Sequence, residues 1–399
     1  MCETIVLNII DLGVIFAIFM LSLICIAVIK SNFYRGFLIL NYHIFFAILY
    51  NVFVCVNGGD ALTYYFEAEK EIHSGVEFLG SDFIFLVNYY LKSGGVGFVG
   101  VSAIFSFIGF IGILYFDTLL YRLKDNFGKY SALVRNVIIF MPSMHFWSTG
   151  IGKEPIAFLS GVLFSWSILN RKFGFFVIAL LLMLFIRPHI AGLMTVAFVL
   201  GEFVLFLYRP SRYKILTVFI YSSSMVVFLA TVINFALSFL NLRISKIQAF
   251  FVSRENIISV GGGSIDLLNE NAFFSFIYYL FRPFFYDAKS VFMVVNSFEN
   301  LLLLIIFILL PFSSKVFNYL YFIRHPYLHL FIFSASTLLF SSLITNNAGI
   351  AVRHKWTIIP ALVVYFVLPS VLLRFQKNKG SNVSPKKLIL NKNINKKNL

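Results

Sequence analysis

The sequence predicts an all-α, polytopic integral membrane protein with about 11 transmembrane helices (range about 10–12). Hydrophobic residues make up 60% of the 399 residues and charged residues only 12%, against roughly 25% charged in soluble domains. Apolar runs of about 20 residues also recur from end to end, which is the length a helix needs to cross a bilayer core. Because lipid offers the backbone no hydrogen-bond partner, and because these runs do not alternate like outer-membrane strands, we expect helices.

The apolar runs place the predicted spans along one transmembrane domain, residues 1–374. The spans are 6–29, 36–57, 96–121, 131–144, 154–170, 172–187, 190–208, 214–240, 298–314, 326–345 and 356–374. Two long loops, at about 58–95 and 241–297, separate spans on one face of the membrane. Residues 375–399 contain lysines and no acidic residue, which predicts a basic, disordered cytoplasmic tail facing an anionic membrane surface.

Positive charge follows every second span. Because Lys and Arg accumulate in cytoplasmic loops, this pattern predicts a cytoplasmic C-terminus and an N-terminus on the outer face. Both long loops then lie on the outer face, together with several basic residues in short turns that the topology does not explain. The formal net charge of +15 therefore points to membrane lipid as a partner, and nucleic acid is not expected.

The first candidate site residue is Asp60, which follows the second span after Gly58-Gly59. One interpretation is a helix N-cap. The other is a catalytic carboxylate at the membrane surface that takes a proton from a hydroxyl group or binds a divalent cation. Tyr64 and Tyr65 follow one helical turn later and are candidates for stacking on a sugar ring, or are interfacial anchors. A divalent cation held by Asp60 is the one candidate cofactor. The three cysteines show no metal-ligand spacing, and no metal ligand is assigned.

The second candidate segment is "MPSMHFWSTGIGKEP", which begins at Met141. Its proline and glycines predict irregular backbone at membrane depth, which is tolerated only where it lines protein or water. His145 and Glu154 are candidate catalytic residues, Lys153 is a candidate phosphate ligand, and Trp147 is a candidate sugar-stacking residue. The alternative for Glu154 is a favourable interaction with the dipole of the helix it begins.

Basic residues at short outer turns are the candidate phosphate ligands. Arg187 and His189 lie in "IRPHI" between two spans, where the alternative is a tight turn with a snorkelling arginine. An arginine in so short an outer turn requires an anionic partner. The other candidates are Arg282, in an aromatic segment, and Arg353, His354 and Lys355, which cluster before the last span.

These residues together predict a particular chemistry. Cations on the outer face bind the phosphate of a polyprenyl-linked sugar, and a carboxylate activates an acceptor hydroxyl for attack on the anomeric carbon. The glycine-rich "GGGSID" lacks the strand and the Gly-Lys-Ser/Thr of a phosphate-binding loop, so the sequence contains no nucleotide-binding motif to supply energy.

The motifs "GDALTYY", "MPSMHFWSTGIGKE", "LFIRPHIA", "LFRPFFYDA", "NSFEN" and "NNAGIAVRHKWTIIP" together resemble bacterial O-antigen or capsule repeat-unit polymerases and related membrane glycosyltransferases of the C superfamily. The resemblance runs from about residue 58 to 370 through short, degenerate motifs. It implies a C-superfamily-like helical bundle with re-entrant or interfacial outer-face segments. It also implies an inner-membrane enzyme that uses undecaprenyl-linked donors on the periplasmic side. Asp60 matches the acidic residue that those glycosyltransferases carry near the acceptor, although theirs follows the first span and Asp60 follows the second.

Three functions stay open at this point. The leading one is a polymerase that joins undecaprenyl-pyrophosphate-linked oligosaccharide repeat units, with a chain-length regulator as a candidate partner. The second is a glycosyltransferase that adds a single sugar from a polyprenyl-phosphate donor. The third is a flippase or transporter of the lipid-linked unit. This function predicts internal repeats and charged residues near the bilayer midplane, and the sequence shows no convincing repeat.

Overall fold

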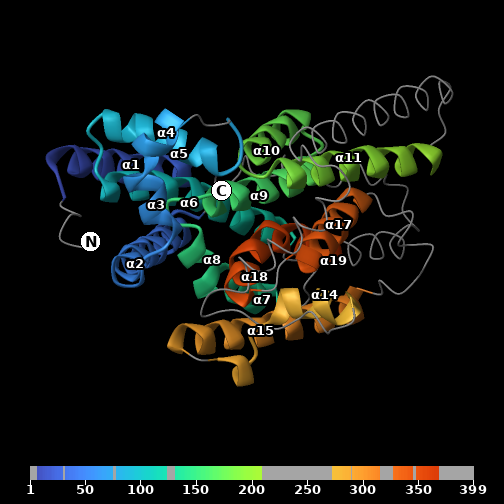
Figure 1. Cartoon of the computed structure of the whole chain (residues 1–399). Helices are drawn as coiled ribbons and strands as arrows, with labels where there is room; N and C mark the ends of the chain where they lie inside the picture. The colour runs from blue at the N-terminus through green and yellow to red at the C-terminus, as the bar shows by residue number, and fades with distance from the viewer. Residues whose placement is uncertain are drawn as a thin grey trace, which may run out of the picture.

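The computed structural model describes residues 7–29, 32–74, 78–123, 131–208, 272–288, 290–314, 327–344 and 347–367. Within these residues the chain is helical and contains no extended strand, which confirms the all-α class (Figure 1).

The helices of the first half include long ones that follow the predicted apolar runs and shorter ones that lie between those runs. They are α1 (Ile9–Val28), α2 (Phe33–Asn57), α3 (Asp60–Phe66), α4 (Ala68–Ser74), α5 (Ser81–Ser93), α6 (Phe98–Arg122), α7 (Ser131–Ile139), α8 (Pro142–Trp147), α9 (Glu154–Asn170), α10 (Phe173–Ile186) and α11 (Pro188–Tyr208). The predicted outer loop at 58–95 is therefore largely helical, since α3, α4 and α5 lie within it.

The described residues of the second half form further helices of different lengths. These are α14 (Ala272–Phe281), η4 (Phe285–Asp287), α15 (Val291–Ser314), α17 (Leu328–Ile344), α18 (Ala348–His354), η5 (Lys355–Thr357) and α19 (Ile359–Val367). The predicted span 214–240 and the predicted basic tail 375–399 lie outside the described residues.

Helix α9 forms the centre of the described structure. Residues Pro155 to Ile168 are all buried, and the helix packs against α6, α10, α17 and α19. In Figure 1 the red-orange helices α17, α18 and α19 lie beside it, and α14 and α15 form the outer layer below. Segments from both halves of the chain therefore meet around one buried helix.

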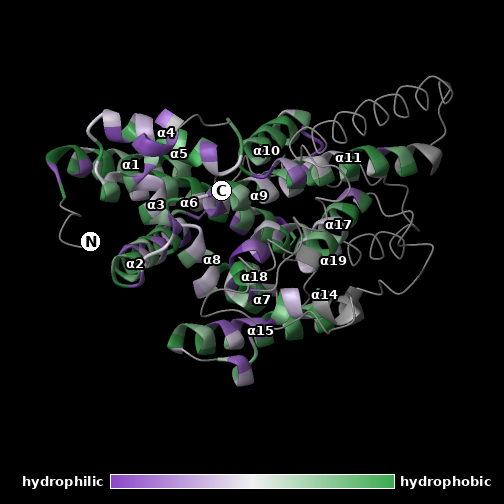
Figure 2. Ribbon diagram, viewed as in Figure 1, coloured by the Kyte–Doolittle hydropathy of each residue, from purple (hydrophilic) through white to green (hydrophobic). Residues whose placement is uncertain are grey.

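Apolar side chains cover much of the outside of the molecule. Among the described residues, four helices (α1, α2, α6 and α15) are long and apolar enough to cross a membrane by length and composition, and shorter apolar helices include α10. Large hydrophobic residues such as Ile9, Phe16 and Phe45 are exposed on helices that are apolar along their length, which indicates contact with lipid or another protein. Figure 2 shows hydrophobic colour on most helices and polar colour on short helices such as α4 and α18.

The predicted fourth span, 131–144, is not one continuous helix. Helix α7 ends at Ile139, Met141 has extended backbone angles (φ −67°, ψ 119°), and α8 begins at Pro142. Proline lacks an N–H and disfavours helical angles at the residue before it, so Pro142 ends one helix and begins the next. The consequence is that α8 can turn toward the pocket described below.

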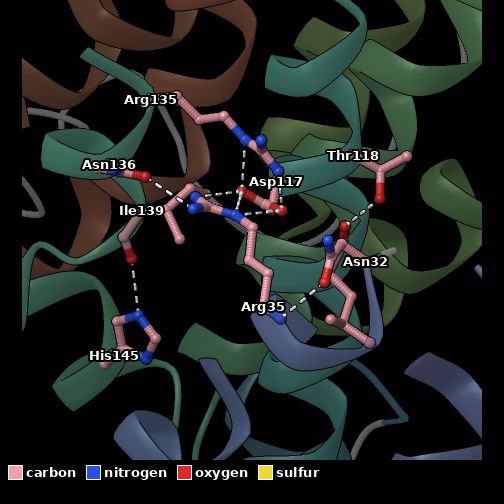
Figure 3. A network of polar contacts seen from close by, with 9 residues as sticks. Asn32, Arg35, Asp117, Thr118, Arg135, Asn136, Ile139 and His145 are labelled. Carbon is pink, nitrogen blue, oxygen red and sulfur yellow. Dashed lines mark hydrogen bonds and ion pairs between the residues drawn. The ribbon is translucent and has the colours of Figure 1, made fainter. Parts of the chain in front are cut away.

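An ion-pair cluster links α2, α6 and α7 (Figure 3). Asp117 is buried and contacts the guanidinium of Arg35 at 2.8–3.1 Å and Nε of Arg135 at 2.9 Å. Arg35 also donates to Oδ1 of Asn136 at 2.7 Å. One carboxylate therefore pairs with arginines from two other helices and links all three.

Candidate functional site

An open pocket of about 110 Å³ lies where the end of α2, the turn between α8 and α9, and α18 meet. Its lining combines aromatic side chains with two carboxylates and one guanidinium. The lining residues are Tyr50, Phe53, Val54, Gly58, Gly59, Asp60, Trp147, Gly150, Ile151, Glu154 and Arg353. Four of the predicted site residues are among them.

Asp60 reaches this pocket because of the backbone just before it. Gly58 and Gly59 have φ values of 75° and 138°, which L side chains rarely adopt, and the chain turns there from α2 into α3. Gly59 occupies the N-cap position and the Asp60 side chain makes no capping bond. The carboxylate instead accepts a hydrogen bond from Arg353 at 3.0 Å and keeps 64% of its side-chain surface exposed. The capping interpretation is therefore wrong, and Asp60 faces a basic residue.

Glu154 is the central anion of the cluster. Its Oε1 lies 3.1 Å from Nη2 of Arg187, 3.6 Å from Nε of Arg353 and 3.7 Å from Nε2 of His354. The two arginines and the histidine come from the α10–α11 turn and from α18, while Glu154 begins α9. A single carboxylate at the start of the central helix thus gathers basic side chains that are far apart in the sequence.

Several other predicted basic residues lie within electrostatic range of the same cluster. Burial, followed by the positive charges of Arg187 and Arg353, holds the pKa of His354 well below its ordinary value, and His189 and Lys153 act in the same direction. Arg187 is buried and also lies 3.4 Å from the hydroxyl of Thr357. The structure therefore brings Lys153, Arg187, His189, Arg353 and His354 to one region.

Two donors at this pocket have no hydrogen-bond partner among the described residues. They are the indole Nε1 of Trp147 and the Nε of Arg353, both shielded from solvent. The Arg353 guanidinium lies 5.9 Å from the Trp147 ring centroid, so the two side chains are neighbours. Buried donors are normally satisfied, and these two are suited to an oxygen-rich ligand such as a phosphate or a sugar hydroxyl.

The two predicted stacking tyrosines point to different places. The Tyr64 hydroxyl donates to Oγ of Ser81 at 3.5 Å. Burial raises the pKa of Tyr64 to about 12, opposed by this hydrogen bond and reinforced by the carboxylates of Glu154 and Asp60. Tyr65 donates to the carbonyl of Val96 at 3.0 Å and packs against Phe98. Tyr65 therefore joins α3 to the start of α6 and does not line the pocket.

Three further predicted residues have their contacts elsewhere. His145 is buried against His43, with their Nδ1 atoms 3.1 Å apart. Arg282 pairs with Asp287 at 2.8 Å and lies over Tyr278. Lys355 is fully buried and donates to Oδ1 of Asn300. None of these three lines the pocket.

Lys355 belongs to a buried polar network between η5, α8 and α15. Glu299 accepts from the backbone N–H of Ser143 at 2.7 Å and from its hydroxyl, and Trp356 donates to the same hydroxyl at 3.0 Å. Asn300, next to Glu299, accepts from Lys355. The network therefore holds η5, α8 and α15 together.

Burial lowers the pKa of Lys355 to about 8, while Glu299 opposes this shift. Since the unfolded chain holds the proton up to about pH 10.5, unfolding takes up a proton between these values. The free energy of unfolding should be flat below about pH 8 and rise by about 3 kcal/mol toward pH 10.5. Thermal denaturation in detergent across this range measures the slope. Lys355→Met should remove this pH dependence, and Lys70→Met, at an exposed lysine, should retain it. An unchanged slope in Lys355→Met would show that another group causes the pH dependence.

Sequence reasoning missed the aromatic wall of the pocket. Tyr50, Phe53 and Val54 lie on α2 at helical spacing before Asp60, and residues three and four apart share one helix face. That spacing could have been traced back from Asp60. Thr357, which contacts Arg187, carried no comparable signal. Among the described residues, no three His, Cys, Asp or Glu side chains gather closely enough to hold a metal ion.

Comparison of the chain with family models, with curated proteins and with solved structures finds no match. The functional argument therefore depends on the geometry of the pocket and on the motifs in the sequence.

Proposed function

We propose that this protein is a membrane glycosyltransferase that joins undecaprenyl-pyrophosphate-linked oligosaccharide repeat units into a surface polysaccharide, an O-antigen or a capsule. The observation that carries the proposal is the convergence of Asp60, Glu154, Arg187 and Arg353 on one pocket region. Asp60 and Arg353 are 293 residues apart in the sequence, and the cluster combines a partly exposed carboxylate with cations that suit a lipid-borne phosphate.

The proposed setting is the inner membrane of a bacterium, with the pocket on the periplasmic face. In this topology the N-terminus is periplasmic, the C-terminus is cytoplasmic, and about 11 helices cross the membrane in a C-superfamily-like bundle. Support for this comes from the basic loops that follow alternate spans and from the apolar helices of the structure.

In the proposed mechanism the phosphate of the donor binds Arg353 and takes the place of Asp60. Arg353 bridges Asp60 and Glu154, so a phosphate that draws its guanidinium away leaves the Asp60 carboxylate free. Arginine binds phosphate oxygens bidentately, and the Nε of Arg353 and the N–H of Trp147, which make no hydrogen bond in the described structure, add donors. Binding of the donor thus exposes the base that the reaction requires.

The chemical step is a substitution at the anomeric carbon of the donor. The acceptor hydroxyl oxygen forms a bond to that carbon while the bond from carbon to the phosphate oxygen breaks. The hydroxyl proton moves to the Asp60 carboxylate, and the electron pair leaves with the phosphate, whose charge Arg353 and Arg187 stabilise. General base catalysis of this kind typically contributes about 100-fold or more.

Asp60→Asn tests the proposal because it removes the base and leaves the side-chain volume. Since the Asp60 side chain is 64% exposed, we expect little change in stability. Polymer formation in the source bacterium should fall about 100-fold, with single repeat units accumulating on the carrier lipid. Polysaccharide ladders on gels measure this outcome in a deletion strain that expresses the variant.

The matched control is Glu69→Gln, which removes an exposed carboxylate from the neighbouring α4. It should restore the full ladder. A full ladder in Asp60→Asn as well would refute the role of Asp60 as the base.

The alternative is a transferase that adds a single sugar from a polyprenyl-phosphate donor. The same carboxylates and the same arginine at the pocket would serve either donor. Deletion of the gene distinguishes the two activities. Loss of a polymerase leaves one complete repeat on the carrier, and loss of a single-sugar transferase leaves a product that lacks that sugar.

A further inference from the structure

The Trp147 N–H and the Arg353 guanidinium, the two donors of the pocket, are carried by short helices. Trp147 lies on α8, which has 6 residues, and Arg353 lies on α18, which has 7 residues. Helices this short have little stability of their own, so contacts with the rest of the protein set the direction of each one. The contacts that orient α8 and α18 therefore decide how far apart the two donors lie.

A buried hydrogen bond joins the same two segments one helical turn away from the pocket. The indole Nε1 of Trp356, in η5 directly after α18, donates to Oγ of Ser143 in α8 at 3.0 Å, and both side chains are buried. Trp356 follows Arg353 by three residues and Ser143 precedes Trp147 by four, and residues at these spacings share a helix face. The Arg353 guanidinium lies 5.9 Å from the Trp147 ring centroid. The two pairs are thus successive contacts between α8 and the segment formed by α18 and η5.

Glu299, on α15, fixes the direction of this hydrogen bond. Its carboxylate accepts from the backbone N–H of Ser143 at 2.7 Å and also from the Ser143 hydroxyl. Because the hydroxyl donates its one hydrogen to Glu299, a lone pair of Oγ is left for the indole, which can only donate. Asn300, next to Glu299, accepts from Lys355, the residue before Trp356. Helix α15 therefore holds both α8 and η5.

Aromatic packing defines the position of Trp147 less sharply than this hydrogen bond does. The Trp147 ring meets those of Tyr50 and Phe292 edge-on, with centroids 6.3 and 6.0 Å apart. Edge-on ring pairs are favourable over a range of separations, whereas a hydrogen bond weakens steeply as its angle departs from linear. The bond between Ser143 and Trp356 is therefore the contact that sets α8 against α18.

We propose that Ser143 and Trp356 are positioning residues for the phosphate of the donor, because their hydrogen bond sets the distance between the Trp147 N–H and the Arg353 guanidinium. This role rests on the proposed function, in which both groups bind the donor phosphate. A phosphate accepts from both only when they lie at the right separation, and a misplacement of about 1 Å can cost about 100-fold in rate. Ser143 and Trp356 do not line the pocket, so they act through Trp147 and Arg353.

Titration of the full-length protein in detergent with inorganic pyrophosphate tests this role. In protein labelled with fluorotryptophan, the shift of the Trp147 resonance gives the dissociation constant, and Trp147→Phe identifies that resonance among those of the three tryptophans. Trp356→Phe keeps an aromatic ring and removes the N–H, and Ser143→Ala removes the acceptor oxygen. Each should raise the dissociation constant about 10-fold, within the loss that such a misplacement causes.

The double variant distinguishes one shared hydrogen bond from two unrelated effects. If Ser143 and Trp356 act through the same bond, Ser143→Ala combined with Trp356→Phe should weaken binding about 10-fold, as each single variant does. Independent effects would multiply to about 100-fold and would overturn the proposal. A purely structural role would reduce the number of folded sites and leave the dissociation constant unchanged. An unchanged constant in folded Trp356→Phe would therefore overturn it as well.

Matched controls make the same chemical changes elsewhere in the bundle. Trp166→Phe alters an indole on α9 whose ring centroid lies 4.4 Å from the guanidinium of Arg122. Ser334→Ala removes a hydroxyl that donates within its own helix, α17, at 2.7 Å. Both should bind pyrophosphate as the wild type does. A loss in either control as large as that in Trp356→Phe would attribute the effect to general loosening of the bundle and refute the positioning role.

Arg353→Gln separates a failure of this role from a failure of the proposed function. It removes the guanidinium and should abolish the shift of Trp147 with pyrophosphate. A wild-type protein that binds no pyrophosphate, or an Arg353→Gln protein that binds it equally well, would refute the phosphate site and the positioning role with it. Binding that depends on Arg353 but not on Ser143 or Trp356 would refute the positioning role alone.

Discussion

Replacing Glu154 with glutamine is expected to lower the free energy of unfolding by about 3–5 kcal/mol, the range found when one partner of a buried ion pair is removed. The Glu154 side chain is 17% exposed and that of Arg187 is 8% exposed. Water therefore has little access to stabilise the arginine charge once the carboxylate is lost. Oε1 of Glu154 faces Arg187, Arg353 and His354 together. A neutral amide would leave two guanidinium groups close together without this counter-charge.

Denaturation of the purified protein in detergent measures the change in stability, and polysaccharide ladders measure activity. Both should fall in Glu154→Gln, whereas Asp60→Asn should lower activity alone. Glu69→Gln, on the exposed surface of α4, should leave both unchanged. A Glu154→Gln protein with wild-type stability would show that the arginines find other partners, and the description of Glu154 as the central anion would be wrong.

Replacing Asp117 with asparagine is expected to lower the free energy of unfolding by about 3–5 kcal/mol. No direct effect on the pocket is expected. The Asp117 side chain is 1% exposed, while those of Arg35 and Arg135 are 19% and 15% exposed. Asparagine has the same shape but leaves both guanidinium groups without the carboxylate (Figure 3). The two guanidinium groups would then repel each other, and this repulsion would weaken the contact between α2, α6 and α7.

A charge relocated to a neighbouring position should restore part of this loss. Asn136 already accepts a hydrogen bond from Arg35 at 2.7 Å, so Asp117→Asn combined with Asn136→Asp returns a carboxylate to the same cluster. Denaturation midpoints in detergent should rank wild type above the double variant and the double variant above Asp117→Asn. Thr118→Val, which alters a hydroxyl bonded within its own helix, is the matched control. Equal midpoints for the single and double variants would contradict this expectation. They would show that a carboxylate at position 136 cannot replace the one at position 117.

Glu154 and Asp117 are both buried carboxylates paired with arginines, but we expect only Glu154 to contribute directly to activity. Glu154 lies at the start of α9 beside a pocket with unpaired donors, whereas the partners of Asp117 are all provided by the protein itself. Loss of Asp117 should therefore lower activity only as far as it lowers the amount of folded protein. Loss of Glu154 should lower the activity of each folded molecule as well.

Helix positions were largely predictable from the sequence because they depend on local apolar content. Predicted spans such as 154–170 and 172–187 coincide closely with α9 and α10. The prediction failed at 131–144, where Pro142 divides the segment into α7 and α8. Apolar content is summed over a window, but the loss of one backbone donor at a proline acts at a single residue.

The candidate site was predictable only in part. Helix-end charges such as Asp60, Glu154, Arg187 and Arg353 are visible in the sequence, because charge beside an apolar run requires a partner. Which partner each one takes is not visible. Arg282, which carries the same charge in a similar setting, pairs with nearby Asp287, while Arg353 reaches Asp60 across 293 residues.

The sequence by itself determined an all-helical chain with apolar helices long enough to cross a membrane, since hydrophobicity and backbone hydrogen bonding leave lipid-facing segments few other conformations. Tertiary structure alone decided that the cations gather around Glu154, that Tyr50 and Trp147 line the pocket, and that His43 meets His145. The physical reason is that these contacts depend on how α2, α8, α9 and α18 pack together. Packing is set by the shapes of side chains distant in the sequence, which no local pattern encodes.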